Sequence, residues 1–259
     1  MIAAPRLTIA IATTAERSAS IRLGRLPVDL RWRYVIYCQG GTPAVAPRAD
    51  ISVVVLQGRG VAASRNAAIG ACDTELLLFS DDDVGLEATG LTRLIDVFTE
   101  HTALGLFAGR TVLQDGHSER VYPDRPQRLT LFNSARVGTV ELAVRPAYIR
   151  DNRIGFDLNF GAGGANAIGD EYIFVADCIR SGLWGGYWPI TIAVHDGSSS
   201  GTDFASPQTT RARAKVFERV FGRLVSVPIK LGFIWRHRRR FGSFTELLTF
   251  ARVFLLPLS

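Results

Sequence analysis

The chain has 259 residues, of which 47% are hydrophobic and 21% are charged. This composition is typical of a globular protein with a sizeable core and excludes extensive disorder, and no apolar run approaches the roughly 20 residues that span a bilayer. The formal net charge of +6 is uneven, because residues 1–207 hold 19 Arg against 22 Asp and Glu, whereas residues 208–259 hold 11 Lys and Arg against two Glu. We therefore predict a main domain over 1–207 and a basic, amphipathic helical extension over 208–259.

The N-terminus and the cysteines bear on the compartment of the protein. The apolar run at 7–12 is too short for the h-region of a secretory leader, so it predicts a first strand. The three cysteines, Cys38, Cys72 and Cys178, are scattered and lack metal-ligand spacing. We expect reduced thiols in a cytoplasmic protein.

Strand and helix patterns alternate along the first half of the chain. Near-continuous apolar runs predict buried strands at 6–12, 33–38, 51–56 and 75–79. Helical patterns are expected in the segment containing Arg17, Arg22 and Arg25, at 58–72 and at 86–101. The alternation predicts an α/β domain with an open, mostly parallel sheet flanked by helices. Ligands of such sheets bind beyond the carboxyl ends of the strands.

The second half of the chain is less regular. Strands are expected at 103–113 and 137–144, on either side of a polar loop. A glycine-rich loop over 161–169 then leads into a helix that starts with Asp170 and Glu171. A strand at 187–194 is expected to end on His195.

Three adjacent carboxylates, Asp81, Asp82 and Asp83, follow the predicted strand in LLLFSDDDVGL (76–86). A solvated acidic turn is one interpretation, because Asp is common where strands end. The alternative is a divalent metal ion, Mg²⁺ or Mn²⁺, that bridges carboxylates to a diphosphate. D-x-D spacing lets the outer two carboxylates converge, and Asp82 could bind either metal or ligand.

Further polar residues have both a structural and a functional interpretation. Asp170 and Glu171 suit the first turn of a helix electrostatically, and either could also act as a general base. His195 could be structural or a third metal ligand. Arg65 lies in an Ala-rich helix, where it could be solvated or could contact a nucleotide.

Three segments together resemble family 2 glycosyltransferases of the GT-A fold. The first, GVAASRNAAIGACDTELLLFSDDDV (60–84), has a glycine, an Ala-rich stretch with Arg-Asn, and a strand that ends on D-x-D. The second, FDLNFGAGGANAIGDEYIFVADCIRSGL (156–183), has an F-D-x-x-F-G-x-G-like segment and an acidic pair. The third, VHDGSSSG (194–201), has the later histidine. The resemblance covers residues 6–205 in the right order.

This resemblance implies a GT-A, Rossmann-like domain that inverts configuration as it transfers a sugar. The donor would be a UDP-, GDP- or dTDP-sugar, and the acceptor a hydroxyl of a glycan or lipid-linked glycan. By position, the metal ligands would be Asp81, Asp83 and His195. Glu171, or else Asp170, would be the base. The donor nucleotide would be lined by Thr13, Thr14, Gln39, Arg65, Asp81 and Asp82.

The sequence departs from the family pattern at two places. Gln39 stands where members often have an acidic residue that contacts the nucleobase, and the acidic pair is Asp-Glu rather than the usual Glu-Asp or Glu-Glu. We expect the loops 39–50, 114–136 and 198–208 to set substrate choice.

Alternatives exist for the tail and for the whole protein. Interleaved aromatic and basic residues over 208–259 could lie on an anionic membrane at its inner face or pack on the main domain. Nucleic-acid binding is disfavoured, since the main domain is net acidic. A nucleotidyltransferase would usually carry a glycine-rich, basic loop after the first strand, which ATTAERSAS does not match. The remaining alternative is a non-catalytic sugar-nucleotide-binding protein.

Overall fold

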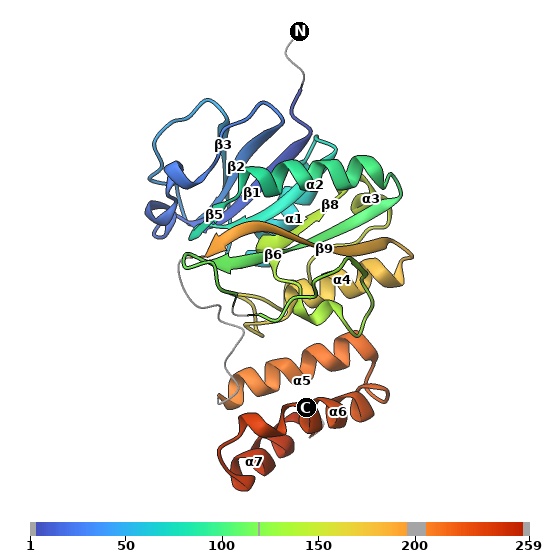
Figure 1. The fold of residues 1–259 in the computed structure, drawn as a ribbon. Helices are drawn as coiled ribbons and strands as arrows, with labels where there is room; N and C mark the ends of the chain where they lie inside the picture. Colours follow the sequence, from blue (N-terminus) through green and yellow to red (C-terminus); the bar gives the residue numbers. More distant parts are fainter. Residues whose placement is uncertain (1–3, 119, 196–205, 256–259) are drawn as a thin grey trace.

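The computed structural model describes residues 4–118, 120–195 and 206–255. Within these residues a nine-stranded sheet forms the centre, in the order β3-β2-β1-β4-β8-β6-β9-β5, with β7 paired to β9 (Figure 1). The strands are β1 (Leu7–Thr14), β2 (Trp32–Gln39), β3 (Ile51–Leu56), β4 (Leu76–Asp81), β5 (Val84–Leu86), β6 (Leu104–Leu113), β7 (Gln127–Arg128), β8 (Leu142–Val144) and β9 (Trp184–His195).

Helices cover both faces of the sheet and form the C-terminal tail. They are α1 (Val61–Ala71), α2 (Ala88–Glu100), α3 (Pro146–Asp151), α4 (Asp170–Arg180), α5 (Pro207–Phe221), α6 (Ser226–His237) and α7 (Phe244–Leu255). Short 3₁₀ turns lie at η1 (Ser18–Ser20), η2 (Leu23–Arg25), η3 (Ser134–Arg136), η4 (Thr139–Glu141) and η6 (Arg238–Arg240).

The central strands alternate their side chains between two cores. Leu7, Ile9 and Ile11 of β1 pack with α2 on one face, whereas Ala10 faces the core that contains residues of α1 and α4. Successive side chains of a strand point to opposite faces. Both faces of the sheet are covered by helices, so the sequences of the central strands are continuously apolar. The arrangement confirms the predicted α/β sheet flanked by helices.

Parallel pairing is confined to part of the sheet. Strands β3, β2, β1 and β4 are parallel, and so are β6 and β9. Strand β8 is antiparallel to both of its neighbours, β4 and β6. The chain runs outward from β1 to β3 and then returns to place β4 on the other side of β1. The strand order therefore reverses between β1 and β4, where a ligand site is expected.

Several predicted elements need correction. The segment with Arg17, Arg22 and Arg25 forms the turns η1 and η2 instead of a helix, since its apolar residues lack helical spacing. Residues 137–144 contribute only the short β8, because the N–H of Gly138 donates to the Glu141 carboxylate at 2.7 Å and closes the turn η4. The sequence did not predict β5, β7 or α3.

The tail packs on the main domain through α5. Val216 and Val220 of α5 contact Tyr172, Ile173 and Ala176 of α4. A second cluster inside the tail joins α5 to α7 through Phe217, Phe250 and Phe254. In Figure 1, α5 lies between the main domain and the pair α6–α7. In the described ranges, none of the helices has the length and apolar character needed to cross a membrane.

Candidate active site

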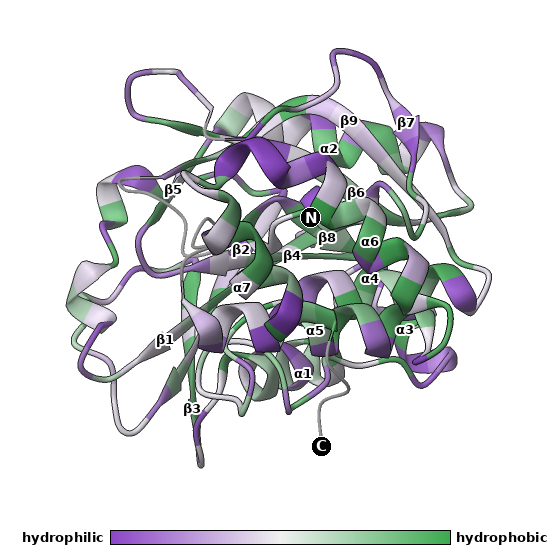
Figure 2. Ribbon diagram, turned by 90° about the horizontal axis from the view of Figure 1, so that it is seen from below, coloured by the Kyte–Doolittle hydropathy of each residue, from purple (hydrophilic) through white to green (hydrophobic). Residues whose placement is uncertain are grey.

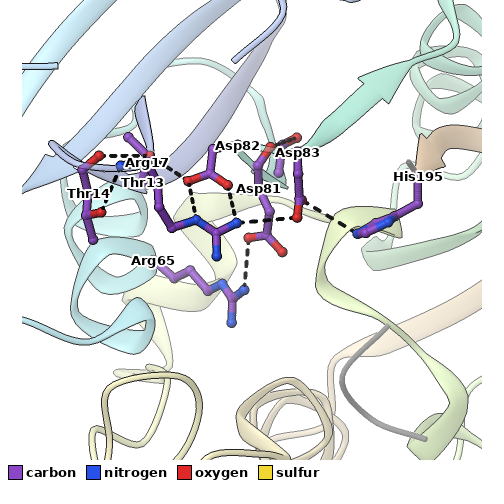
Figure 3. A network of polar contacts seen from close by, with 9 residues as sticks. Thr13, Thr14, Arg17, Arg65, Asp81, Asp82, Asp83 and His195 are labelled. Atoms are coloured by element: carbon purple, nitrogen blue, oxygen red, sulfur yellow. Dashed lines mark hydrogen bonds and ion pairs between the residues drawn. The ribbon is translucent and has the colours of Figure 1, made fainter. Parts of the chain in front are cut away.

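The three aspartates lie at the point where the strand order reverses. Asp81 ends β4 and is aligned with Ala12 of the parallel strand β1, so that Thr13 and Thr14 emerge beside the acidic turn (Figure 3). The Asp81 side chain is 37% exposed. Desolvation raises its pKa, the charge of Arg65 opposes this shift, and the charges of Asp83 and Asp82 add to it. The ionised carboxylate is therefore stabilised by a neighbouring cation.

Asp82 points inward and is held by two donors. The Thr13 hydroxyl donates to it at 2.6 Å, and the Arg17 guanidinium donates through Nη2 at 2.6 Å and through Nε at 3.2 Å. Thr14 supports this loop, because its hydroxyl oxygen accepts the backbone N–H of Arg17 at 3.3 Å. The Asp82 side chain is only 4% exposed. Its contacts fix the conformation of the acidic turn.

Asp83 and His195 are brought together by strand pairing. Strand β5 begins at Val84, directly after the acidic turn, and pairs antiparallel with β9 so that Val84 lies opposite His195. The Asp83 carboxylate is 3.6 Å from His195 Nε2. Arg17 Nη2 also approaches Asp83, at 3.3 Å. The predicted segment after His195, Asp196 to Gly201, lies outside the described residues.

Arg65 connects the acidic turn to the acidic pair on α4. It lies on α1 with 7% of its side chain exposed, and its guanidinium donates to Asp81 at 3.3 Å and to Asp170. It also lies over the Phe156 ring, at 5.5 Å from the centroid. Asp170 is 105 positions further along the sequence. A buried guanidinium thus joins two separate acidic motifs into one site.

The acidic pair begins α4 behind the glycine-rich loop. Gly161 has φ +88°, and a Cβ at this position would lie 2.7 Å from the Asp170 carboxyl carbon. Only a glycine therefore lets the loop close over Asp170. Glu171 is partly exposed. Desolvation by the surrounding protein and the charge of Asp170 raise the pKa of Glu171 above its ordinary value, which suits a proton acceptor.

Gln39 uses both ends of its amide on the backbone of Gly60. Its Nε2 donates to the Gly60 carbonyl at 2.9 Å, and its Oε1 accepts the Gly60 N–H at 3.0 Å. Gln39 is 5% exposed. Gly60 has φ +110° and begins α1. Gln39 thereby fixes the turn that positions Arg65, and a contact with a nucleobase stays a prediction.

Two site residues escaped the sequence analysis. Arg17 was expected in a surface helix, although an arginine directly after a strand-end turn suggests such a contact. Asn66 was noted only as part of the Arg-Asn pair. Its side chain accepts the N–H of Phe156 at 2.7 Å and donates to the same residue's carbonyl at 2.9 Å. Asn66 thus fixes the segment that leads into the glycine-rich loop.

A cavity of about 50 Å³ has His195 in its lining. Arg120 and Tyr122, from the polar loop 114–136, line another part of it. Both contact Glu141, with the Tyr122 hydroxyl donating at 2.6 Å and Arg120 approaching at 3.4 Å. Glu141 is 1% exposed, and burial raises its pKa. The loop is therefore anchored beside the site by a buried polar cluster.

Two of the three predicted metal ligands, Asp83 and His195, lie together at this edge. Asp83 and His195 offer an oxygen and a nitrogen donor, and Asp83 is 38% exposed. Within the described ranges, no three His, Cys, Asp or Glu side chains are gathered as a metal site. Mg²⁺ typically takes one or two carboxylates and completes its coordination with phosphate oxygens and water. Asp81 is adjacent but contacts Arg65 instead.

Residues 39–176 match the model of glycosyl transferase family 2. The chain belongs to this family, as the resemblance predicted. The match argues against the nucleotidyltransferase alternative. No curated protein matches the chain in sequence at a significant level.

Solved structures share the fold at low sequence identity. TarS of S. aureus superposes with a TM-score of 0.61 at 15% identity, over 93% of this chain and 44% of TarS. TarS 1–349 in complex with UDP-GlcNAc gives 0.61 at 12% identity, over 96% of this chain and 90% of that one. The mannosyltransferase PcManGT of Pyrobaculum calidifontis, in complex with GDP-Man and Mn²⁺, superposes with a TM-score of 0.58 at 13% identity. The match covers 96% of this chain and 79% of PcManGT. These likenesses confirm the predicted GT-A fold. The present chain spans 44% of the TarS chain in the first of these structures.

Proposed function

We propose that this chain is an inverting glycosyltransferase that transfers a sugar from a nucleotide diphosphate to a hydroxyl of a glycan or lipid-linked glycan. The observation that carries the proposal is the Arg65 bridge, which brings the D-x-D turn and the acidic pair of α4 to one place. The fold neighbours TarS, with UDP-GlcNAc, and PcManGT, with GDP-Man and Mn²⁺, support a nucleotide-sugar donor.

Asp83 and His195 would hold Mg²⁺ or Mn²⁺, with Asp81 adjacent, and the ion would neutralise the departing diphosphate. Glu171 would accept the proton from the acceptor hydroxyl as its oxygen bonds to the anomeric carbon and the bond from that carbon to the diphosphate breaks. Asp170 is the less favoured base, because Arg65 already holds its carboxylate. Thr13 and Arg17 fix Asp82, and with it the turn on which Asp81 and Asp83 lie.

Calorimetric titration of UDP, GDP and dTDP, with and without Mn²⁺, tests this proposal. We expect one nucleotide to bind in a Mn²⁺-dependent manner, and Asp83→Ala to abolish that dependence. Asp73→Ala is the matched control, because Asp73 precedes the opposite end of β4 and contacts Arg33. If no nucleotide binds in either condition, the donor assignment is wrong and the contacts of the aspartates are structural only.

A further inference from the structure

The helix α6 is apolar on two sides, and only one of them is covered. Ile229 and Phe233 face the cluster inside the tail. On the other side, Val227, Leu231 and Trp235 are 45%, 51% and 67% exposed. A helix that is apolar all round is normally buried all round. The outer side of α6 therefore lacks the cover that its composition calls for.

We call the exposed apolar side chains of α6 and its neighbour α7, with those of the turn before α6, the outer face. Leu224 lies in that turn, Val227, Leu231 and Trp235 follow at a spacing of four on α6, and α7 adds Phe244 and Leu248 at the same spacing. In Figure 2 this part of the molecule is turned toward the viewer, and hydrophobic residues make up much of the ribbon of α6. Exposed apolar side chains gathered on two neighbouring helices are typical of an interaction surface.

Exposed basic residues surround the outer face. They are Arg223, Arg236, Arg238, Arg239, Arg240 and Arg252. Of the two acidic residues of the tail, Glu218 is paired with Lys230 at 2.6 Å, whereas Glu246 accepts the N–H of Gly242 at 2.9 Å and keeps its charge, one against the six arginines. The surface that borders the apolar side chains is therefore strongly positive.

Trp235 shows how the apolar and basic parts meet. The Arg238 guanidinium lies 4.5 Å from the centre of the Trp235 ring and donates to the Trp235 carbonyl at 2.7 Å. An indole flanked by guanidinium groups suits the boundary between lipid headgroups and acyl chains, where one end of the side chain is apolar and the other polar. A protein partner of matching shape would need no such excess of positive charge.

We infer that the outer face of α6 and α7 docks on the surface of an anionic phospholipid bilayer. The apolar side chains would enter the headgroup boundary, and the arginines would contact lipid phosphates. The helices would lie in the plane of the surface. The main domain would remain in water, held by α5. This inference is independent of the sugar and nucleotide that the enzyme uses.

Vesicle co-sedimentation of the full chain tests the inference, with phosphatidylcholine vesicles compared against vesicles that also contain phosphatidylglycerol. We expect binding on the order of tenfold or more tighter to the anionic vesicles, and weaker binding at high salt. The double variant Arg239→Gln, Arg240→Gln should lose on the order of tenfold in affinity, and Leu231→Ser with Trp235→Ser should abolish binding. All four residues are exposed, so we expect unchanged melting temperatures.

Val28→Ser with Leu30→Ser is the matched control, because these side chains are 70% and 71% exposed but precede β2, far from the tail in sequence. The control should bind like the unaltered protein. Equal binding to neutral and anionic vesicles, or binding that the tail variants leave intact, would overturn the inference. So would a dimer in sedimentation velocity that Leu231→Ser with Trp235→Ser dissociates, or binding of RNA in place of vesicles.

Discussion

Arg65, beneath the acidic turn, and Arg239, in the tail, have opposite surroundings. Arg65 is 7% exposed and contacts carboxylates on two elements, whereas Arg239 is exposed beside an apolar surface. A buried guanidinium fixes the geometry of its partners, because it cannot exchange them for water. An exposed one adds charge but little stability. The position of an arginine in the fold, more than its place in a motif, therefore decides what it does.

The largest expected effect concerns the proton acceptor of the main domain. Glu171→Gln removes the carboxylate and should lower turnover by about 10²- to 10⁴-fold, with nucleotide affinity retained. Initial rates and calorimetry measure the two quantities. Glu100→Gln, on the exposed end of α2, is the control. Unchanged turnover in Glu171→Gln would assign the base to another residue or favour the non-catalytic alternative.

Substitutions of the buried Arg65 and of the exposed Arg239 should differ most clearly in their effects on stability. Arg65→Met leaves Asp81 and Asp170 without their shared cation and should reduce the free energy of unfolding by about 3–5 kcal/mol. Arg239→Met should change it by no more than about 0.5 kcal/mol. Urea denaturation followed by circular dichroism measures both. Similar losses in the two variants would contradict the comparison.

The pH dependence of stability tests the environment of Glu171. Its pKa is raised in the folded state, so above its ordinary pKa the unfolded chain has already released a proton that the native state still holds. The free energy of unfolding should therefore fall as pH rises from the ordinary to the raised pKa. Glu171→Gln should lose this slope, and denaturation at a series of pH values checks it. An identical slope in both proteins would show that other groups cause it.

A smaller effect, on Mn²⁺ affinity, is expected from Arg17, whose half-exposed side chain is intermediate between the buried Arg65 and the exposed Arg239. Arg17→Ala removes a positive charge beside Asp82 and Asp83 and should tighten Mn²⁺ binding a few-fold, on the order of 1 kcal/mol. Calorimetric titration of Mn²⁺ alone measures the affinity. Arg31→Ala, whose partner Asp29 lies at the far end of β2, should change nothing. Weaker Mn²⁺ binding would mean that the loss of the Arg17 contact that fixes the turn outweighs the loss of its repulsion of the ion.

The sequence predicts the central strands well but not the short elements. Strands such as β1 and β4 are buried on both faces, so a continuous apolar run identifies them. Strand β5 has three residues, too few for any periodicity to show. Its pairing with β9 is what places Asp83 near His195. A contact of that kind depends on the sheet order, which no local pattern contains.

In the candidate active site, residue type and position in the chain predict where the polar side chains lie in the fold, but not which residues they contact. The strand ends were enough to locate Thr13, Gln39 and Asp81 at one edge. The partners were not predictable, because Arg65 and Asp170 are 105 positions apart and Gln39 turns its amide to the backbone of Gly60. Predictions for the nucleotide and metal contacts therefore need bound ligands to test them.

The contact between α5 and the start of α4 has a consequence for unfolding. Gly169 precedes α4 with φ +90°, and a Cβ at this position would lie 2.4 Å from Val216 of α5. Arg219 of α5 also contacts Asp177 at 2.7 Å and Asp157 at 3.2 Å. The net acidic main domain and the basic tail, which meet near residue 207 in the sequence, are therefore tightly packed against each other. We expect the tail and the main domain to melt in a single cooperative transition in calorimetry, so that loosening α5 would also loosen the helix that begins with Asp170 and Glu171.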